Sequence, residues 1–368
     1  MEGTINTIWC LYRDFSMITL AEKLLMVSKT PVKPEVRRAV EFVSSTPMMI
    51  TPQYTNSGVT LQYSLDGTSW TTITSGATTP NANIIYFRGS ATGTKSLYTF
   101  NTTTNSWTFS GATNLECNGK LDRLIQNTLG DDSDILIISS YCFAYIFNNV
   151  TSLIRVYDDF LPATTLAGSC YQQMFFNCTS LTTAPELPAT TLARSCYYSM
   201  FYGCTGLTTV PELPAMTLQP NCYQAMFYGC TGLTTAPALP AMTLTNSCYY
   251  GMFYGCIGLT TAPILPATTL ASSCYDRMFV NCTGLTTLPK LSTLALQPSC
   301  YYRMFYGCTK IKVSTALTGI YDTAYRIPIT GTGTTATDAL TEMFTATGGT
   351  FTGTPEINTT YYTENTPV

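Results

Sequence analysis

LPATTLARSCYYSMFYGCTGLTTVPE, residues 187–212, is one copy of a 26-residue unit that recurs between Leu161 and Cys308. Each copy contains two cysteines eight residues apart, and equivalent cysteines of successive copies are 26 residues apart. A fixed period of roughly 20–50 residues is typical of solenoids, in which each unit buries its apolar face against its neighbours. The period therefore predicts a solenoid. The paired cysteines are Cys170 and Cys178, Cys196 and Cys204, Cys222 and Cys230, Cys248 and Cys256, Cys274 and Cys282, and Cys300 and Cys308.

The unit predicts one short helix and one short strand. Ser195 precedes the first cysteine and is a good N-cap, while Gly203, replaced only by asparagine in other copies, suits a left-handed helix end. Between them, cysteine with methionine and tyrosine with phenylalanine are spaced i, i+4 and would form one core face. The following stretch, Thr231–Pro240 in the next copy, favours a strand that Pro237 and Pro240 cut short.

The repeat resembles a known family. Its pattern C-Y-x-x-M-F-x-G-C-T-x-L-T-T-A-P-x-L-P, with an aromatic residue before Cys-Thr-x-Leu as in Phe201–Leu207, is similar to the BspA-like (Treponema-type) leucine-rich-repeat family. The resemblance covers Cys142–Cys308. It implies a curved, non-enzymatic binding scaffold, usually on bacterial surfaces and involved in adhesion, and it implies no catalytic residue.

The regions before residue 114 have different patterns. Residues 1–45 contain two predicted helices, at 17–27 and Glu35–Val43, and are interpreted as a helical adaptor for attachment to a larger assembly. Residues 46–113 are short alternating runs separated by turn residues, which predicts a small Ig-like β-sandwich.

The regions that flank the repeats are interpreted as caps. Residues 114–160 contain a predicted helix, Glu116–Leu129, followed by a degenerate first repeat, and residues 309–368 are expected to form a C-terminal cap over the solenoid of residues 161–308. The expected fold class is therefore mixed α/β. It is a leucine-rich-repeat solenoid of 26-residue repeats, each a short strand plus a short helix, preceded by a small all-β Ig-like domain and an N-terminal helical segment.

The composition argues against an enzyme. The chain has 368 residues, no histidine, 11% charged residues and a formal net charge of −3. Without imidazole, the commonest general base and metal ligand is missing, and no carboxylate pair stands out. No apolar run is long enough to span a bilayer, and the charge gives no footprint for nucleic acid. We therefore expect no catalytic residue, metal site, cofactor, nucleic-acid partner or membrane span.

The cysteines are expected to be free thiols in the core. Partners eight apart on a short helix would have Cα atoms about 12 Å apart, which exceeds the reach of a disulfide. Equivalent cysteines of adjacent coils would have parallel rather than facing Cβ vectors. Cysteine is also a small and readily buried residue. The spacing therefore predicts two ladders of buried thiols.

Positions that differ between copies are expected to lie on the surface and to carry any specificity. Such weakly charged, tyrosine-rich surfaces suit recognition of proteins or glycans. The candidate ligand-contact residues are Tyr198, Gln224, Tyr250, Asp276, Arg277, Tyr302 and Arg303 on the predicted helix, and Glu186, Glu212 and Lys290 on the predicted strand.

These patterns predict a non-enzymatic recognition or adhesion protein. The first fifteen residues lack the basic and apolar pattern of a secretory signal. We therefore expect a bacteriophage virion component, a head or tail fibre or a decoration, assembled in the bacterial cytoplasm and exposed on the particle. Residues 1–45 would contact other virion proteins, and the repeats would bind a host-surface or environmental glycan or protein. The alternatives are a BspA-like adhesin on the bacterial cell surface and a purely structural virion protein, and homo-oligomerisation is left open.

Overall fold

The computed structural model describes residues 39–54, 59–91, 106–125, 140–365 and 367–368. Residues 38–368 form one compact unit. The predicted helix at 17–27 and most of the predicted adaptor lie outside the described residues. Within the described residues, the regular elements are eleven strands and two short 3-10 segments, without an α-helix.

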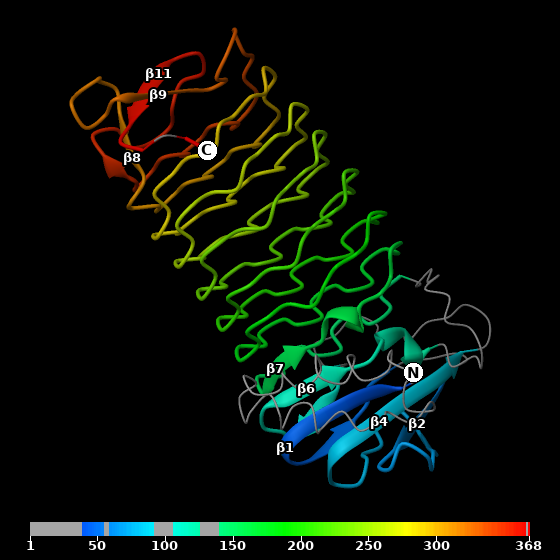
Figure 1. Ribbon diagram of the computed structural model, residues 1–368. Helices are drawn as coiled ribbons and strands as arrows, with labels where there is room; N and C mark the ends of the chain where they lie inside the picture. Colours follow the sequence, from blue (N-terminus) through cyan, green and yellow to red (C-terminus); the bar gives the residue numbers. More distant parts are fainter. Residues whose placement is uncertain (1–38, 55–58, 92–105, 126–139, 366) are drawn as a thin grey trace, which may run out of the picture. The chain divides into compact units, whose positions relative to one another are not determined.

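The strands before the repeats form one seven-stranded sheet in the order β3-β2-β4-β1-β6-β7, with β5 paired to the second half of β1 (Figure 1). Only β6 and β7 pair in parallel. The predicted Ig-like sandwich is wrong, because these strands make a single sheet rather than two facing ones. The bounds are β1 Val40–Thr51, β2 Val59–Ser64, β3 Thr71–Ile73, β4 Ala82–Ala91, β5 Thr108–Ser110, β6 Leu115–Asn118 and β7 Leu153–Val156.

Two predicted helices are replaced by strands of this sheet. In the described part of Glu35–Val43, the chain enters β1, where alternate residues such as Val40 and Phe42 are buried and the backbone pairs with both β4 and β6. The described part of the predicted helix Glu116–Leu129 instead forms β6, a turn at Gly119 with φ +81° and a 3-10 segment, Leu121–Leu124. Pairing across the sheet has overridden local helical propensity in both places.

The sheet packs directly on the first repeat. Phe147 of the degenerate repeat lies 6.2 Å from Phe42 and 5.8 Å from Phe109, measured between ring centroids. The Trp107 amide donates to the carbonyl of Ile146 over 3.1 Å. β7 itself belongs to the first repeat and bridges onward from Arg155 to Thr183, while a second 3-10 segment, Asp158–Phe160, follows it. The sheet therefore continues into the repeats instead of forming a separate core.

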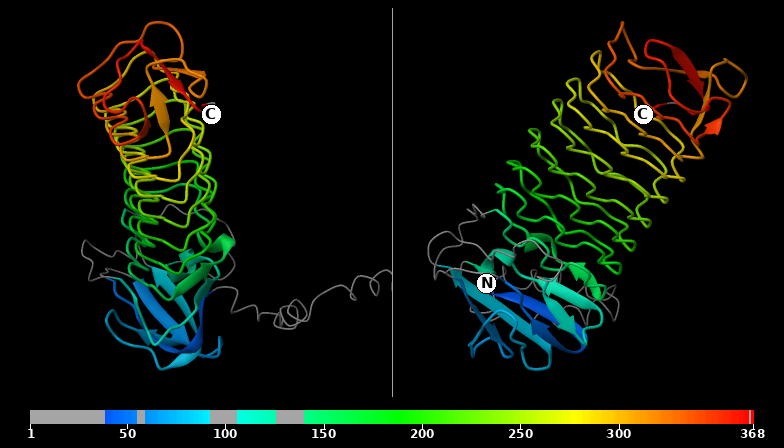
Figure 2. Two further views of the ribbon diagram at one scale, coloured as in Figure 1. Left: turned by 90° about the vertical axis from the view of Figure 1, so that its left-hand side faces the viewer. Right: turned by 180° about the vertical axis from the view of Figure 1, so that it is seen from behind.

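The predicted leucine-rich-repeat solenoid unit, a strand plus a helix, is wrong. Each 26-residue unit is a coil made of consecutive turns, and regular strands are confined to the two sheets before and after the repeats. Successive coils lie one on another in sequence order, as the green-to-yellow part of Figure 1 and both views of Figure 2 show. We call the part of each coil from the residue before the first cysteine to the second cysteine, such as Ser195–Cys204, the turn segment.

The hydrogen bonds of the turn segment explain why it is not a helix. Alternate amides donate three residues back within the coil, as from Tyr198 to Ser195 and from Tyr202 to Ser199, instead of the four that an α-helix requires. The amides between them donate to the next coil, as from Tyr197 to the carbonyl of Cys222 over 3.0 Å. Half of the amides in the turn segment thus donate to a neighbouring coil. In an α-helix these amides would donate to carbonyls of the same helix.

Backbone angles in the turn segment repeat every four residues. In one coil, Ser195, Ser199 and Gly203 have φ of 57°, 50° and 72°. The glycine was expected to be left-handed as a helix end, and the serine was expected to be a helix N-cap. Both are turn residues in the left-handed region. A chain that returns to this region every fourth residue cannot continue as a right-handed helix.

The second predicted element is also missing. The Thr-Thr pairs form only isolated parallel bridges, such as Thr183 to Thr209, and not strands. A proline follows each pair closely and removes a backbone donor, so pairing stops after one residue. The coils nevertheless share hydrogen bonds here, because Gly232 donates to the carbonyl of Thr205 over 3.1 Å.

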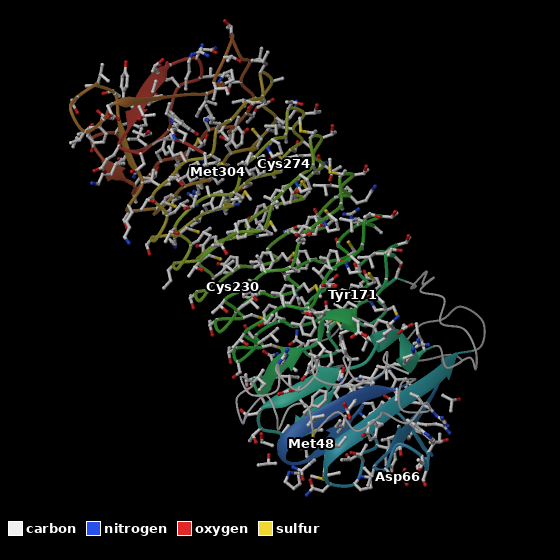
Figure 3. All side chains as sticks on the ribbon, viewed as in Figure 1. Met48, Asp66, Tyr171, Cys230, Cys274 and Met304 are labelled. Carbon is white, nitrogen blue, oxygen red and sulfur yellow. The ribbon has the colours of Figure 1, made fainter. Side chains whose placement is uncertain are left out.

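The interior of the stack consists of side-chain ladders. The second-cysteine ladder donates weak hydrogen bonds to carbonyls of the preceding coil, as from Cys230 Sγ to Phe201 over 3.1 Å. Phenylalanines stack at 5.4–5.8 Å between ring centroids along the coils, as Phe227 does on Phe253. Figure 3 labels Cys230 and Cys274 within this interior. Apolar burial between identical layers is thus the main stabilising contribution.

A last coil and a small sheet follow the repeats. Ala339–Thr347 repeats the turn segment, since Tyr301 donates to Ala339 and Phe305 to Met343. Phe344 stacks on Phe305 at 5.8 Å. The sheet has the order β10-β8-β11-β9. Its strands are β8 Lys312–Ser314, β9 Thr323–Arg326, β10 Gly348–Gly349 and β11 Thr360–Thr363.

Candidate recognition surface

The outward side of the turn segments is lined by tyrosines. The four-residue period of the turns buries Cys196, Tyr197, Ser199, Met200 and Phe201 and leaves Tyr198 and Tyr202 partly exposed. Stacking of the coils turns each of these exposed positions into a column. We call the two columns together the tyrosine face; its members are Gln172, Tyr198, Gln224, Tyr250, Asp276 and Tyr302 in one column, and Phe176, Tyr202, Tyr228, Tyr254, Val280 and Tyr306 in the other. Asp276 and Val280 are buried, and the other members are partly exposed.

The second column contains the closest ring stacking in the described part of the chain. Centroid distances are 4.7 Å from Phe176 to Tyr202, 4.4 Å from Tyr202 to Tyr228 and 4.3 Å from Tyr228 to Tyr254. The rings are within 12° of parallel. Burial, and then the neighbouring hydroxyls of Tyr254 and Tyr202, raise the pKa of Tyr228. The Tyr228 hydroxyl therefore stays protonated, and the stacking holds the three hydroxyls close to one another.

The first column contains a compact polar cluster. The Arg277 guanidinium donates to the Tyr250 hydroxyl over 2.6 Å and to the Asp276 carboxylate over 3.0 Å. It also lies 4.9 Å from the Tyr302 ring and 5.5 Å from the Tyr250 ring, within the range of cation–π attraction. On the next coil, Arg303 contacts the same Tyr302 ring at 5.1 Å. Three successive coils thus contribute to one cluster.

Each charge of this cluster has a counter-charge. The Arg303 side chain forms an ion pair with Glu342 of the last coil. The Asp276 side chain is only 7% exposed, and this burial raises its pKa to about 6 although Arg277 opposes the shift. The face consequently offers hydroxyls, amides and ring edges, with little net charge.

The predicted contact residues separate into two sets. The seven assigned to the predicted helix lie on the tyrosine face or, for Arg277 and Arg303, beside it, and five of them belong to the Arg277 cluster. The remaining three, Glu186, Glu212 and Lys290, are exposed on the proline-rich side of the coil. Among the described residues, no hydrogen bond or ion pair joins these three to the tyrosine face, and the Lys290 amide donates to the carbonyl of Val368.

Tyr202, Tyr228, Tyr254 and Tyr306 were missed as surface residues by sequence reasoning. A helix places the residue before the glycine close to the core face, and only the four-residue turn period turns it outward. A usable signal existed, since this position varies between Phe176, Tyr202 and Val280 while the residue before it is always phenylalanine.

The cysteines do not contribute to the surface. All fourteen cysteines of the described residues are free and buried. Burial raises the pKa of the thiols in both ladders, to about 12 for Cys196 and about 11 for Cys300. Thiols in this state are poor nucleophiles and poor metal ligands. Among the described residues, no group of three or more metal-binding side chains comes together.

Within the described part of the chain, no helix has the length and apolar character needed to cross a bilayer. Comparison of the chain with protein-family models, curated proteins and solved structures yields no match. The resemblance to BspA-like proteins therefore stays a prediction, and the argument for function rests on the tyrosine face itself.

Proposed function

We propose that this chain is a non-enzymatic recognition protein whose tyrosine face binds a neutral glycan chain lying along the coils. The observation that carries the proposal is the column Tyr202–Tyr228–Tyr254, whose rings stack at 4.4 Å and 4.3 Å with their hydroxyls in register. A regular polymer can contact several coils at once, so weak individual contacts add through multivalency.

Rigidity supports this function. Tyrosine loses little conformational entropy on binding, and stacking with coil-to-coil hydrogen bonds holds the column in place before any ligand arrives. The Tyr228 amide and ring are each fixed, the amide by the carbonyl of Ala225 over 3.2 Å and the ring between two others. Binding would then require little reorganisation of the protein.

Charge supports a neutral ligand. The cations beside the face, Arg277 and Arg303, already pair with Asp276 and Glu342. A polyanion would find no uncompensated cation, and a polycation no uncompensated carboxylate. A ligand rich in hydroxyls suits a surface of tyrosine hydroxyls and glutamine amides, both of which donate and accept hydrogen bonds.

Binding to a panel of neutral polysaccharides, measured by affinity electrophoresis and calorimetry, tests the proposal. We expect Tyr202→Ala with Tyr228→Ala and Tyr254→Ala to weaken binding by about tenfold or more, since each aromatic contact contributes about 0.5–1.5 kcal/mol. Tyr228→Phe keeps the stacking and removes one hydroxyl, so it separates binding from folding. Glu186→Gln with Glu212→Gln is the control and should bind as the unmodified protein does.

Other outcomes would redirect the proposal. Retained glycan binding in the triple variant together with loss in the glutamate control would place the ligand on the proline-rich side. If the chain bound a protein but no polysaccharide, the proposed ligand would be a protein and not a glycan. Binding of neither would favour a purely structural role. The predicted bacteriophage virion placement, with attachment through residues 1–45, stays a prediction.

A further inference from the structure

The hydrogen bonds between turn segments all run in one direction. From the interface that begins at Ser169 onward, the earlier coil of each pair supplies five amide donors and the later coil supplies five carbonyl acceptors. The N-terminal end of the stack therefore presents acceptors, and the C-terminal end presents donors. For the final interface the donors are Ser299, Tyr301, Arg303, Phe305 and Gly307, and their acceptors are Thr337, Ala339, Thr341, Met343 and Thr345.

The last coil has the same donors but no coil beyond it. By register they are the amides of Asp338, Leu340, Glu342, Phe344 and Ala346. The chain end covers two of them, because Glu342 donates to Thr354 Oγ1 and Phe344 to the Gly353 carbonyl, each over 2.8 Å. Within the described residues, the amides of Asp338, Leu340 and Ala346 have no acceptor, and the first two lie close together at the start of the coil.

These two residues border a groove of about 410 Å³ between the last coil and the segment Thr354–Ile357. Leu340 and Ile357 supply apolar side chains to it, and Asp338 and Glu356 supply carboxylates. Its lining contains no lysine or arginine. Neither carboxylate forms an ion pair within the described residues, although Asp338 accepts a hydrogen bond from Thr341 Oγ1 over 3.1 Å.

We propose that this groove binds an extended, basic segment of a partner protein, which adds to the last coil as a further coil would. Two amides at alternate residues match two carbonyls at alternate residues of an extended peptide, as in strand addition to a sheet edge. A lysine or arginine of the segment would pair with Asp338 and Glu356, while an apolar side chain would contact Leu340.

Two other occupants fit less well. A small anion would accept from the two amides but would meet two uncompensated carboxylates. A second copy of the chain would have to offer the acceptor end of its own stack, and that end is covered by the N-terminal sheet, where Trp107 donates to Ile146. A basic extended peptide has neither difficulty.

The test uses the full chain and two capped hexapeptides, Thr-Lys-Val-Thr-Lys-Thr and its glutamate counterpart, measured by fluorescence anisotropy. We expect the basic peptide to bind in the micromolar-to-millimolar range and the acidic one to bind more weakly. Asp338→Asn with Glu356→Gln should lower the affinity for the basic peptide by about three- to tenfold, as expected for the loss of one or two exposed ion pairs. Asparagine tolerates the φ of 53° at this position, so the last coil should keep its conformation.

Asp322→Asn is the matched control, because Asp322 is an exposed acid of the C-terminal region outside the groove and should leave affinity unchanged. Amide hydrogen exchange over Thr335–Thr345 provides the second readout. Asp338 and Leu340 should exchange rapidly in the free protein and slow on peptide binding. Equal affinity for both peptides, no binding at millimolar concentration, or no protection would overturn the proposal. Protection that depends only on protein concentration would overturn it in favour of self-association.

Discussion

The amide of Gly251 donates to the carbonyl oxygen of Asp276 on the next coil over 2.8 Å, with Gly251 at a φ of 57°. One coil earlier, Ala225 makes the same bond to Tyr250 over 2.8 Å at a φ of 52°. The left-handed conformation thus belongs to the coil and not to the residue. The coil-to-coil hydrogen bond requires it whether or not the side chain favours it.

The first prediction follows from this pair of positions. Gly251→Ala should lower the free energy of unfolding by about 1 kcal/mol, because a Cβ disfavours the left-handed region. Space is available, since the nearest atom to an added Cβ is Tyr228 Cδ2 at 4.0 Å. Ala225→Gly should raise the same quantity by a similar amount. Urea unfolding measures both, and changes of the same sign in the two variants would contradict the left-handed assignment.

A second prediction concerns a glycine with a different constraint. A Cβ on Gly232 would lie 2.7 Å from the Thr205 carbonyl oxygen and 3.1 Å from that of Leu207, both on the preceding coil. Neither backbone oxygen can move without separating the coils. Gly232→Ala should therefore cost about 2 kcal/mol, more than Gly251→Ala, as overpacking does. Equal costs in the same urea assay would mean that the coils are further apart than described.

A third prediction concerns the thiols. Burial raises the pKa of the described cysteines, so the reactive thiolate is scarce at neutral pH. The native protein should resist iodoacetamide at about pH 8 at all fourteen positions, and unfolding in urea should expose them together. As the pH is raised, Cys300 should react before Cys196, because its pKa is about 11 and that of Cys196 is about 12.

Alkylation sites found by peptide mass spectrometry decide this prediction. Cys10 lies outside the described residues and is left out of the comparison. Rapid labelling of Cys230 or Cys274 at neutral pH in the folded protein would show that the interior ladders are open to solvent.

A fourth prediction concerns pH. Desolvation raises the pKa of Asp276 from 3.8 to about 6, so the folded state holds this proton more tightly than the unfolded state. The resulting stabilisation is fully present below about pH 4 and is lost as the pH rises through about 6. Asp276→Asn lacks this titration. The melting temperature of the unmodified protein, minus that of the variant, should decrease as the pH is raised from about 4 to about 6.

Circular dichroism melts across this pH range measure the difference, with Asp322→Asn as an exposed control. Parallel curves for the unmodified protein and Asp276→Asn would show that Asp276 is more hydrated than its 7% exposed side chain indicates.

The interior of the stack was largely predictable. Cys196, Tyr197, Met200 and Phe201 were expected in the core and are buried. They were expected there by i, i+4 spacing on a helix, yet the same spacing arises from turns that repeat every four residues. The two backbones bury nearly the same side chains, so the apolar pattern could not distinguish them.

The structure differs from the predictions mainly where contacts between coils determine the conformation. The Thr-Thr pairs suggested strands, but prolines and the turn geometry leave only single bridges such as Thr183 to Thr209. The tyrosine column was missed because Tyr202 turns outward only in the four-residue period. The Arg277 cluster could not be predicted either, since Tyr250 and Tyr302 reach Arg277 from neighbouring coils.

The sequence by itself determined the period of 26 residues, the residues that recur in each layer and the burial of the cysteines, because identical units must bury identical faces. The tertiary structure alone decided the backbone conformation. An isolated turn segment would favour local hydrogen bonds, whereas a neighbouring coil offers acceptors to Tyr197 and Ser199 and selects left-handed residues that no local preference would choose. Half of the amides find their partners only across coils, so the conformation of each coil depends on the next one.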